Sequence, residues 1–566
     1  MYDEEALSAI DQHPLLAEFD TIPDDKEIHD AVLKMKDKAP GDSGLKPQLW
    51  KALLSEEATF QILKIMVLDF WESELPPQEW LNGLLKILAK KGDLSLPGNY
   101  RGIMLLECAY KIISILLLNR LQPIAEKLDH EQQCGFRPGR GCTDAVYTVK
   151  MAMKKRREHS LESWILFLDL VKAFDRVPRA LLWKLLLRYG VPEKIVRLLK
   201  ALHQNVLVKF EVEGTFHEVN CTIGVKQGDV LGPVLFIMFM AGVMTSWRNS
   251  TDCPSLTFFT REDFTLTGRK HTDAGQEFTL DDSEYADDTA ALFDSRENTQ
   301  KYCPLLVAHF KKWGMEIHVG DVRTPKKKSK TEVLFVAAPP STYTTNPATY
   351  DDKDLSNIDL GNGHFFPVVA SFCYLGSFLT RDCSDDEDVE ARIEAAGNAF
   401  GALRKPIFAK ASIALEAKKM VYLTLILSIL LYGAESWSLT EKIYKKLRCF
   451  HARCLRGMCR ITRWHTRKHR ISTQDLLERL NLKSMDAYVT KRHLQWAGHL
   501  ARMPMERLPR RMMSCWVDSK RPVGCPSFTY GRGLNKSLRK AGIDMNNWHA
   551  LAQNREDWRL AINCVE

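Results

Sequence analysis

The alternation of apolar and polar residues predicts helices in the first quarter of the chain. Apolar positions recur every three to four residues from Glu27 to about Leu54, from Phe60 to Trp71 and from Tyr110 to Leu128, which is the period of an amphipathic helix. The sequence Ala-Pro-Gly-Asp at residues 39–42 interrupts the first segment, because adjacent proline and glycine force the chain out of helical geometry. We therefore expect two short helices there, followed by two longer ones.

Short apolar runs farther along predict strands. These runs are Trp164 to Leu170, Val206 to Val212, Glu218 to Ile223 and Ala290 to Phe293. Strands interleaved with helices favour an α+β or α/β core over a bundle or a sandwich. After about Ser384 the pattern becomes almost wholly helical. Residues 250–277 and 321–362 are rich in Thr, Asp, Gly, Pro and Lys, so we expect them to form long surface loops.

The composition is that of a globular protein with several units. At about 100 to 200 residues per domain, 566 residues predict three or four units, and 45% hydrophobic with 27% charged residues excludes a disordered or collagenous chain. The longest apolar stretch, Val421 to Ala434, is shorter than the roughly 20 residues of a membrane span, so we expect no membrane partner. The first residues lack the features of a secretory signal, so the 14 cysteines are expected to be reduced thiols of an intracellular protein.

The positive charge is concentrated towards the C-terminal end. The whole chain carries a net charge of +8, but residues 441–540 contain 25 Lys and Arg against 6 Asp and Glu. The remaining residues therefore carry a net charge of −11. A basic segment on an acidic body is typical of a nucleic-acid-binding region, although a solvated helical surface explains charge clusters equally well.

Three motifs with acidic residues lie beside apolar runs in the middle of the chain. Residues 167–175 read FLDLVKAFD, residues 224–233 read GVKQGDVLGP, and residues 285–293 read YADDTAALF. Adjacent carboxylates raise each other's pKa unless a cation neutralises them. An Asp pair alone is usually a surface feature, and the chain has others at 281–282, 351–352 and 385–386. The preceding Tyr-Ala and the order of the three motifs distinguish the pair at 287–288 from these.

The order of these motifs resembles the palm motifs of reverse transcriptases, specifically those of non-LTR (LINE-type) retrotransposons. KAPGDSGL at 38–45 resembles the N-terminal extension motif of that family, and KKGDLSLPGNYRGIMLL at 90–106 and QCGFRPGRGCTDAV at 133–146 resemble its finger motifs. Residues 374–377 resemble its primer grip, residues 430–437 its thumb and residues 492–504 its C-terminal region. The resemblance covers about residues 24–560.

The resemblance implies an α+β right-hand polymerase fold that performs RNA-directed DNA polymerisation. The implied partners are template RNA, primer or target DNA, and the dNTPs that extend the primer 3′-hydroxyl. The expected parts are a flexible lead-in at 1–23, an N-terminal extension and fingers at 24–165, a palm at 166–383 with loop insertions near 250–277 and 321–362, a helical thumb at 384–447, and a basic, mainly helical nucleic-acid-binding domain at 448–566.

The resemblance also implies a metal site. Asp169, Asp287 and Asp288 would hold two Mg²⁺ ions, with the backbone carbonyl of Leu170 as an extra ligand. Hard oxygen ligands without His or Cys nearby favour Mg²⁺, or Mn²⁺, over Zn²⁺. One ion would lower the pKa of the primer 3′-hydroxyl, and the other would neutralise the triphosphate. Lys330 matches the family lysine that protonates the pyrophosphate leaving group.

Other positions are implied to contact the incoming nucleotide. Phe174 lies five residues after Asp169, where the family places the aromatic steric gate that rejects a ribose 2′-hydroxyl. Gln227 and Gly228 match the loop beside the nucleotide and template, where glycine permits close backbone approach. Basic residues of the finger motifs are the implied phosphate or substrate contacts; they are Lys90, Lys91, Arg101 and Arg137.

The C-terminal region interleaves cations with aromatic residues. Cations neutralise phosphates and exposed aromatic rings stack on bases, whereas core packing is the simpler interpretation of each tryptophan. The aromatic residues concerned are Trp464, Trp496, Trp516, Tyr530 and Trp548. The polymerase motifs begin near residue 24, which we expect to leave no room for an N-terminal apurinic-type endonuclease, and the C-terminal Cys and His residues lack zinc-site spacing. A separate endonuclease is therefore a candidate partner.

Two alternatives stay open. The first is a catalytically silent or host-adopted retroelement remnant that binds nucleic acid without polymerising it. The second is an intron maturase, to which the finger and thumb motifs are less similar. Because elements of the resembled family prime on chromosomal DNA, the nucleus is the expected location of the working protein.

Overall fold

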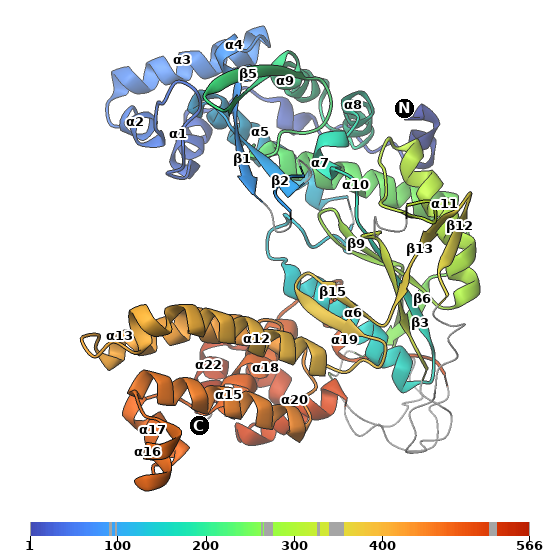
Figure 1. Cartoon of the computed structure of the whole chain (residues 1–566). Coiled ribbons are helices and arrows are strands. Elements are labelled where there is room, and N and C mark those ends of the chain that lie inside the picture. Colours follow the sequence, from blue (N-terminus) through green and yellow to red (C-terminus); the bar gives the residue numbers. More distant parts are fainter. Residues whose placement is uncertain are drawn as a thin grey trace.

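The computed structural model describes residues 2–89, 93–96, 99–128, 130–261, 264, 275–324, 329–338, 356–519 and 529–564. Figure 1 shows N-terminal helices beside one sheet, a central sheet covered by helices, and a layer of C-terminal helices. The N-terminal and C-terminal helices lie at opposite ends of that view, and the central sheet joins them. The mixed content of helices and strands agrees with the expected α+β class.

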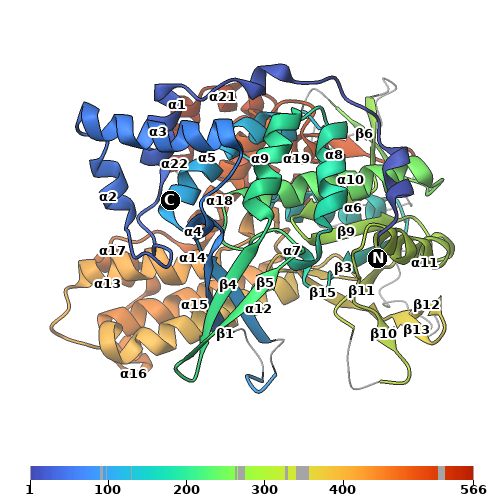
Figure 2. The ribbon, with the colours of Figure 1, turned by 90° about the horizontal axis from the view of Figure 1, so that it is seen from above.

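The helices predicted in the first quarter are present. They are α1 (Asp25–Lys34), α2 (Pro47–Ala52), α3 (Glu57–Ser73) and α5 (Cys108–Glu126), and a further short helix, α4 (Gln78–Leu81), lies outside the predicted segments. Asp24 caps α1 by accepting a hydrogen bond from the backbone N–H of Glu27 (2.7 Å). The strands β1 (Gly83–Ala89), β2 (Tyr100–Leu105), β4 (Val206–Val212) and β5 (Thr215–Cys221) form a sheet in the order β2-β1-β4-β5. Figure 2 shows the β4–β5 ribbon extending beside β1.

The central sheet has the strand order β14-β11-β3-β9-β8. Its middle strand, β3 (Ser163–Leu168), is buried along its whole length. Leu166 joins a core with α5, α10 (Leu231–Ser250) and α11 (Arg296–Lys312), whereas Phe167 joins a second core with α6 (Cys142–Glu158). A strand buried on both faces reads as a continuous apolar run, which is why its sequence predicted it. The other strands are β8 (Asp282–Tyr285), β9 (Asp288–Phe293), β11 (Glu332–Val336) and β14 (Val368–Val369).

The two segments expected to be surface loops contain strands, which corrects that expectation. In the first segment, β6 (Leu256–Thr260) and β7 (Gln276–Leu280) pair with each other, and β6 pairs with β17 (Cys515–Trp516). In the second, β11 is a buried strand of the central sheet. The strands β10 (Gly320–Asp321), β12 (Ile358–Gly361) and β13 (His364–Phe366) form a further sheet. Short strands with one exposed face carry polar residues, so composition alone did not separate them from loops.

The C-terminal helices divide between two cores. The helices α12 (Asp386–Leu403), α13 (Leu415–Val421), α14 (Leu427–Leu430), α15 (Glu441–Cys459) and α17 (Thr473–Leu480) share one core. The helices α18 (Met485–Ala501), α19 (Leu508–Met513), α20 (Tyr530–Lys540), α21 (Trp548–Gln553) and α22 (Arg555–Asn563) pack with α6 against the central sheet. Tyr147 on α6 meets Trp496 edge-on, with ring centroids 5.4 Å apart. The expected boundary at residue 448 therefore falls inside α15, and the basic region is integrated into the fold.

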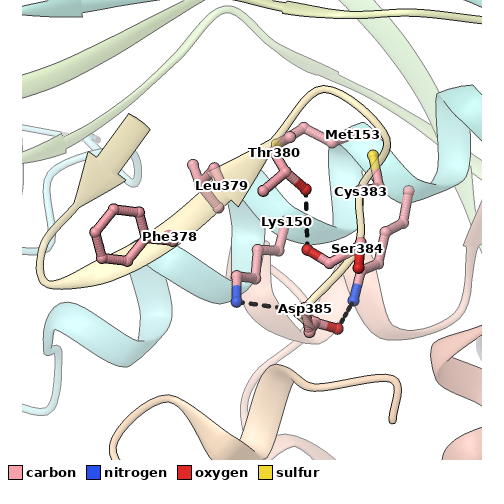
Figure 3. Close-up of a pocket in the computed structure, with 9 residues that line it drawn as sticks. Lys150, Met153, Phe378, Leu379, Thr380, Cys383, Ser384 and Asp385 are labelled. Atoms are coloured by element: carbon pink, nitrogen blue, oxygen red, sulfur yellow. Dashed lines mark hydrogen bonds and ion pairs between the residues drawn. The ribbon is translucent and has the colours of Figure 1, made fainter. Parts of the chain in front are cut away.

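A buried ionic network ties α6 to the start of α12. Lys150 Nζ donates to Asp385 Oδ1 (3.1 Å) and to Asp388 Oδ2 (2.9 Å), and Lys154 Nζ donates to Asp385 Oδ2 (2.8 Å). Figure 3 shows Lys150 and Asp385 facing each other beside the strand β16 (Ser377–Thr380). Burial by itself raises the pKa of Asp385, but the two lysine charges outweigh it and lower that pKa to about 2. The network therefore holds the helical layer to α6 through ionised groups.

One described helix, α10, is long and apolar enough to cross a membrane by length and composition alone. In this fold 83% of its most apolar window is buried. It packs against α5, α8 (Arg179–Arg188) and α11, and α8 in turn packs against α9 (Glu193–His203). This is the position of a core helix, which is apolar around its whole circumference because other elements surround it.

Candidate active site at the β8–β9 hairpin

Two of the acidic motifs meet at one end of the central sheet. Asp169 follows β3 directly, and Asp288 is the first residue of the neighbouring antiparallel strand β9. Leu168 pairs with Thr289 across these strands. Continuing that register by one residue brings Asp169 beside Asp288, so the sheet itself sets their proximity.

The turn of the β8–β9 hairpin brings the third carboxylate to the same end. Tyr285 pairs with Asp288, which leaves Ala286 and Asp287 as a two-residue turn. Ala286 has a φ of +59°, a left-handed conformation that costs a non-glycine residue about 1–3 kcal/mol. The surrounding structure must therefore hold this turn in place.

The three carboxylates affect one another electrostatically. Loss of surrounding water raises the pKa of Asp288 to about 6, and the charges of Asp287 and Asp169 add to the rise, although one side of Asp288 remains open to solvent. The pKa of Asp287 is also raised, chiefly by burial and further by Asp169, while Arg101 opposes the rise. Three like charges held this close destabilise one another unless a cation neutralises them.

A lysine and a histidine side chain approach Asp169 from neighbouring segments. Lys330 Nζ lies 3.9 Å from Asp169 Oδ2, and His318 Nε2 lies 3.8 Å from the same oxygen. The backbone of Asp169 is held by the same segments, because its carbonyl accepts from the N–H of His318 (2.9 Å) and its N–H donates to Thr331 Oγ1 (3.1 Å). The structure therefore places Lys330 beside Asp169. His318 was missed, because it belongs to no recognisable motif and reaches the site only through tertiary pairing.

The donor set of the site fits a hard divalent cation. Its candidate ligands are carboxylate oxygens, which Mg²⁺ and Mn²⁺ prefer, and their mutual repulsion is the kind that a bound cation relieves. Within the described ranges, no group of three or more His, Cys, Asp or Glu side chains is drawn together tightly enough to hold a metal ion. Lys330 supplies positive charge beside Asp169, one of the three carboxylates.

Hydrogen bonds from Gln133 hold the strained turn at residues 286–287, an arrangement we call the Gln133 clamp. Gln133 Oε1 accepts hydrogen bonds from the backbone N–H groups of Ala286 and Gly135 (2.8 Å each), and its Nε2 donates to Glu284 Oε2 (3.0 Å) and to the carbonyl of Ala286 (3.3 Å). Gln133 is 1% exposed, and a Cβ at Gly135 would lie 2.3 Å from the nitrogen of Ala286. The finger motif at 133–146 thus supports the turn at 286–287, a role that its sequence did not reveal.

For the polymerase activity that the sequence motifs imply, replacing Gln133 with Ala is expected to slow nucleotide incorporation by about 10- to 100-fold. The substitution leaves buried partners unpaired, which costs about 1–3 kcal/mol, and each 1.4 kcal/mol is a factor of ten in rate. The rate constant at saturating dNTP is the quantity to measure. Gln132→Ala is the matched control, because Gln132 contacts β8 through its backbone carbonyl. Equal rates for the two variants would contradict the clamp.

The basic finger residues that we expect to contact phosphates or substrate lie at different distances from the carboxylates. Arg101 is exposed on β2, and its charge counteracts the raised pKa of Asp287, so it lies near the carboxylates. The guanidinium of Arg137 donates to the backbone carbonyls of His130 and Gln133, which occupies it within its own loop. Lys90 and Lys91 lie outside the described residues. Arg101 is therefore the finger residue that the structure brings towards the aspartates.

The expected nucleotide contacts are held by packing and by close backbone approach. Phe174, on the short helix α7 (Ala173–Arg176), stacks on Phe236 of α10 with ring centroids 4.3 Å apart. Gly228 has a φ of +117°, and a Cβ there would lie 2.4 Å from the carbonyl oxygen of Met104 on β2. The carbonyl of Gln227 accepts from the N–H of Met104 (2.9 Å). The loop at 227–228 is therefore fixed against β2, and only glycine fits at its second position.

Residues 88–331 match the family model described as reverse transcriptase (RNA-dependent DNA polymerase). The matched segment contains all three aspartates, Lys330 and the Gln133 clamp. Residues 88–331 are therefore similar to a reverse transcriptase domain, and the candidate site lies within the matched segment.

The chain is similar to the polymerases of transposable elements from Drosophila melanogaster. It is 24% identical over 401 residues to the probable RNA-directed DNA polymerase from transposon BS, which covers 68% of this chain and 38% of that protein. It is 23% identical over 444 residues to the RNA-directed DNA polymerase from mobile element jockey, an alignment that covers 76% of this chain and 43% of that relative. A third relative, the retrovirus-related Pol polyprotein from the type-2 retrotransposable element R2DM, is 28% identical over 203 residues, an alignment that covers 36% of this chain and 18% of that relative. The chain spans less than half the length of each of these relatives.

Proposed function

We propose that this chain is the RNA-directed DNA polymerase of a retroelement, which extends a primer 3′-hydroxyl with dNTPs on an RNA template. The observation that carries the proposal is the meeting of Asp169, Asp287 and Asp288 at the ends of adjacent strands inside the segment that matches the reverse transcriptase model. Their electrostatic coupling supports a site that functions with a bound cation.

Asp169, Asp287 and Asp288, with the carbonyl of Leu170, would hold two Mg²⁺ ions, and Mn²⁺ would serve as a substitute. When bound, such cations lower the pKa of the primer 3′-hydroxyl and neutralise the triphosphate. The β8–β9 turn and the end of β3 orient the carboxylates, and Gln133 restrains the turn. Lys330, 3.9 Å from Asp169, would hold the proton that the pyrophosphate leaving group needs.

The remaining side chains divide the recognition of the nucleotide. Arg101, with Lys90 or Lys91, would neutralise the phosphates, because a planar guanidinium pairs well with phosphate oxygens. The ring of Phe174, fixed by stacking on α10, would exclude a ribose 2′-hydroxyl. The 227–228 loop would lie against the nucleotide and template, and the close packing of Gly228 on β2 keeps this backbone in one position.

The arrangement of the described regions supports a right-hand assignment. In this proposal α1–α5 with the β2-β1-β4-β5 sheet are the N-terminal extension and fingers, the central sheet is the palm, and the helices from α12 onward are the thumb and a nucleic-acid-binding region. Template RNA, primer or target DNA and a separate endonuclease would be the partners. The nucleus would be the place of action, since the related elements prime on chromosomal DNA.

Primer extension by the purified full chain tests the proposed function. With a labelled DNA primer annealed to a heteropolymeric RNA template, dNTPs and Mg²⁺, we expect DNA products that extend to the template end. Chelation with EDTA should abolish them, and ribonucleotides should not replace dNTPs because Phe174 closes the sugar site. Binding of the primer-template without extension in Mg²⁺ or Mn²⁺ would favour the silent, nucleic-acid-binding remnant and overturn the proposal.

A further inference from the structure

One tryptophan of the basic C-terminal region is exposed. The side chain of Trp464, on the short helix α16 (Arg463–Lys468), is 60% exposed. Trp496, Trp548 and Trp558 are buried in the core that includes the central sheet, and Trp516 stacks on Phe259 of β6 with centroids 4.9 Å apart. Core packing therefore accounts for these four rings and leaves Trp464 unexplained.

The cations around Trp464 lack acidic partners. Within the described ranges, no ion pair is formed by the seven basic residues of this surface, which are Arg453, Arg456, Arg460, Arg463, Arg467, Lys468 and Arg470. We call this set, together with Trp464, the α16 surface. The two acidic side chains of the neighbouring helix α17 are engaged elsewhere, because Asp475 caps its helix at Ser472 and Glu478 accepts from Gln474.

The cations of the α16 surface repel one another. Burial lowers the pKa of Arg456, and the nearby charges of Arg463 and Arg453 lower it further. The pKa of Lys418 on α13 is also lowered, mainly by burial and further by the charge of Arg460. A surface that gathers like charges without carboxylates is stabilised by a polyanion, which releases counterions as it binds.

The aromatic ring adds a second requirement on the ligand. Lys468 Nζ lies over the Trp464 ring, 4.6 Å from its centroid, so a cation covers part of one face of a ring that is otherwise 60% exposed. Stacking on such a ring requires an unpaired base, whereas phosphates of a duplex need only the cations. Figure 1 places α16 and α17 at the end of the C-terminal layer, away from the strands β3 and β9 of the central sheet. The α16 surface is therefore separate from the candidate active site.

We propose that the α16 surface binds single-stranded RNA, with a base stacked on Trp464 and phosphates paired with the surrounding arginine and lysine side chains. The choice of RNA rests on the proposed function, in which the unpaired strand that the chain must hold is the RNA template. Binding at this surface keeps an uncopied stretch of template attached to the helical layer while the carboxylate site acts on the primer end.

The test measures RNA affinity without polymerisation. A fluorescently labelled, unstructured RNA of about 20 nucleotides is titrated with the full chain in EDTA and without dNTPs, and anisotropy reports binding. Trp464→Ala is expected to weaken binding about 5- to 100-fold, because one stacked base contributes about 1–3 kcal/mol. Trp464→Phe should restore most of the affinity. Leu560→Ala, which removes a side chain that is 67% exposed on α22, is the matched control and should bind like wild type.

The contribution of the basic residues of the α16 surface is measured separately, through the salt dependence of the RNA affinity. For Arg463→Gln/Arg467→Gln/Lys468→Gln, the slope of log affinity against log salt concentration should fall in magnitude by about two, since each phosphate contact to a single strand contributes about 0.7. Duplex RNA should lose no affinity in Trp464→Ala. Equal affinity of Trp464→Ala and wild type for the RNA would overturn the proposal. Because these measurements exclude metal and dNTPs, they succeed or fail independently of primer extension.

Discussion

Primer extension by the Asp287→Asn/Asp288→Asn variant is expected to be at least about a thousandfold slower than by the wild-type chain. Asparagine keeps the size of each side chain but removes the charges that would hold the cations, and that charge stabilisation is worth several kcal/mol, with 1.4 kcal/mol for each factor of ten. The measurement is single-nucleotide incorporation at saturating dNTP and Mg²⁺. A rate within tenfold of wild type would contradict the assignment of these carboxylates.

The same variant should fold normally, and this separates a chemical loss from a structural one. The raised pKa values of Asp287 and Asp288 reflect unfavourable burial and repulsion, so removing the charges relieves both, and the thermal midpoint without metal should stay level or rise. Glu297→Gln is the matched control, because it removes one exposed carboxylate in the first turn of α11. Its incorporation rate should equal that of wild type.

Replacing Asp388 with Ala is expected to destabilise the chain by about 3–5 kcal/mol, the cost of removing one partner of a buried ion pair. Asp388 is 0% exposed. Besides Lys150, its carboxylate accepts hydrogen bonds from Ser377 Oγ (2.6 Å), Trp437 Nε1 (2.9 Å) and the backbone N–H of Phe378 (3.1 Å). The substitution leaves these donors and a buried ammonium without that partner. The thermal unfolding midpoint should fall by at least about 5 °C.

Glu394→Gln provides the comparison for this effect. Glu394 lies on the same helix, α12, and is exposed, so neutralising it should shift the midpoint by less than about 1 °C. If Asp388→Ala also shifted the midpoint by less than about 1 °C, the buried network would not be what holds α12 to α6. Nucleotide incorporation at low temperature should survive in the folded fraction, because Asp388 does not touch the carboxylate site.

Local patterns predicted the framework of the molecule well. The run from Trp164 to Leu170 was recognisable because β3 is buried on both faces, and Asp169 stands at its end in the structure. The break at 39–42 separates α1 from α2, and the strand β9 begins at the Asp pair. These features depend on the period of neighbouring residues and on backbone restrictions, which are written in short stretches of sequence.

Features that depend on distant pairing were not predictable in this way. Gln133 meets the 286–287 turn across about 150 positions of sequence, and His318 reaches Asp169 only because the two segments pair. The strands β6, β7 and β11 are short and lie in segments rich in polar residues, so the sequence predicts loops there, and pairing with partners far along the chain makes them strands. The integration of the last helices with α6 was hidden by their positive charge.

The sequence by itself indicated the family that the chain resembles, most of its helices, the strands at the acidic motifs and the identity of the acidic residues, because motifs and periodicity are local properties. Only the tertiary structure decided what supports and surrounds those residues. It placed Gln133 under a turn with a left-handed alanine, set Lys330 and His318 beside Asp169, and left Trp464 exposed while the other C-terminal tryptophans were covered. The physical reason is that hydrogen bonding, burial and charge coupling depend on distances in space, which the covalent order of residues does not specify.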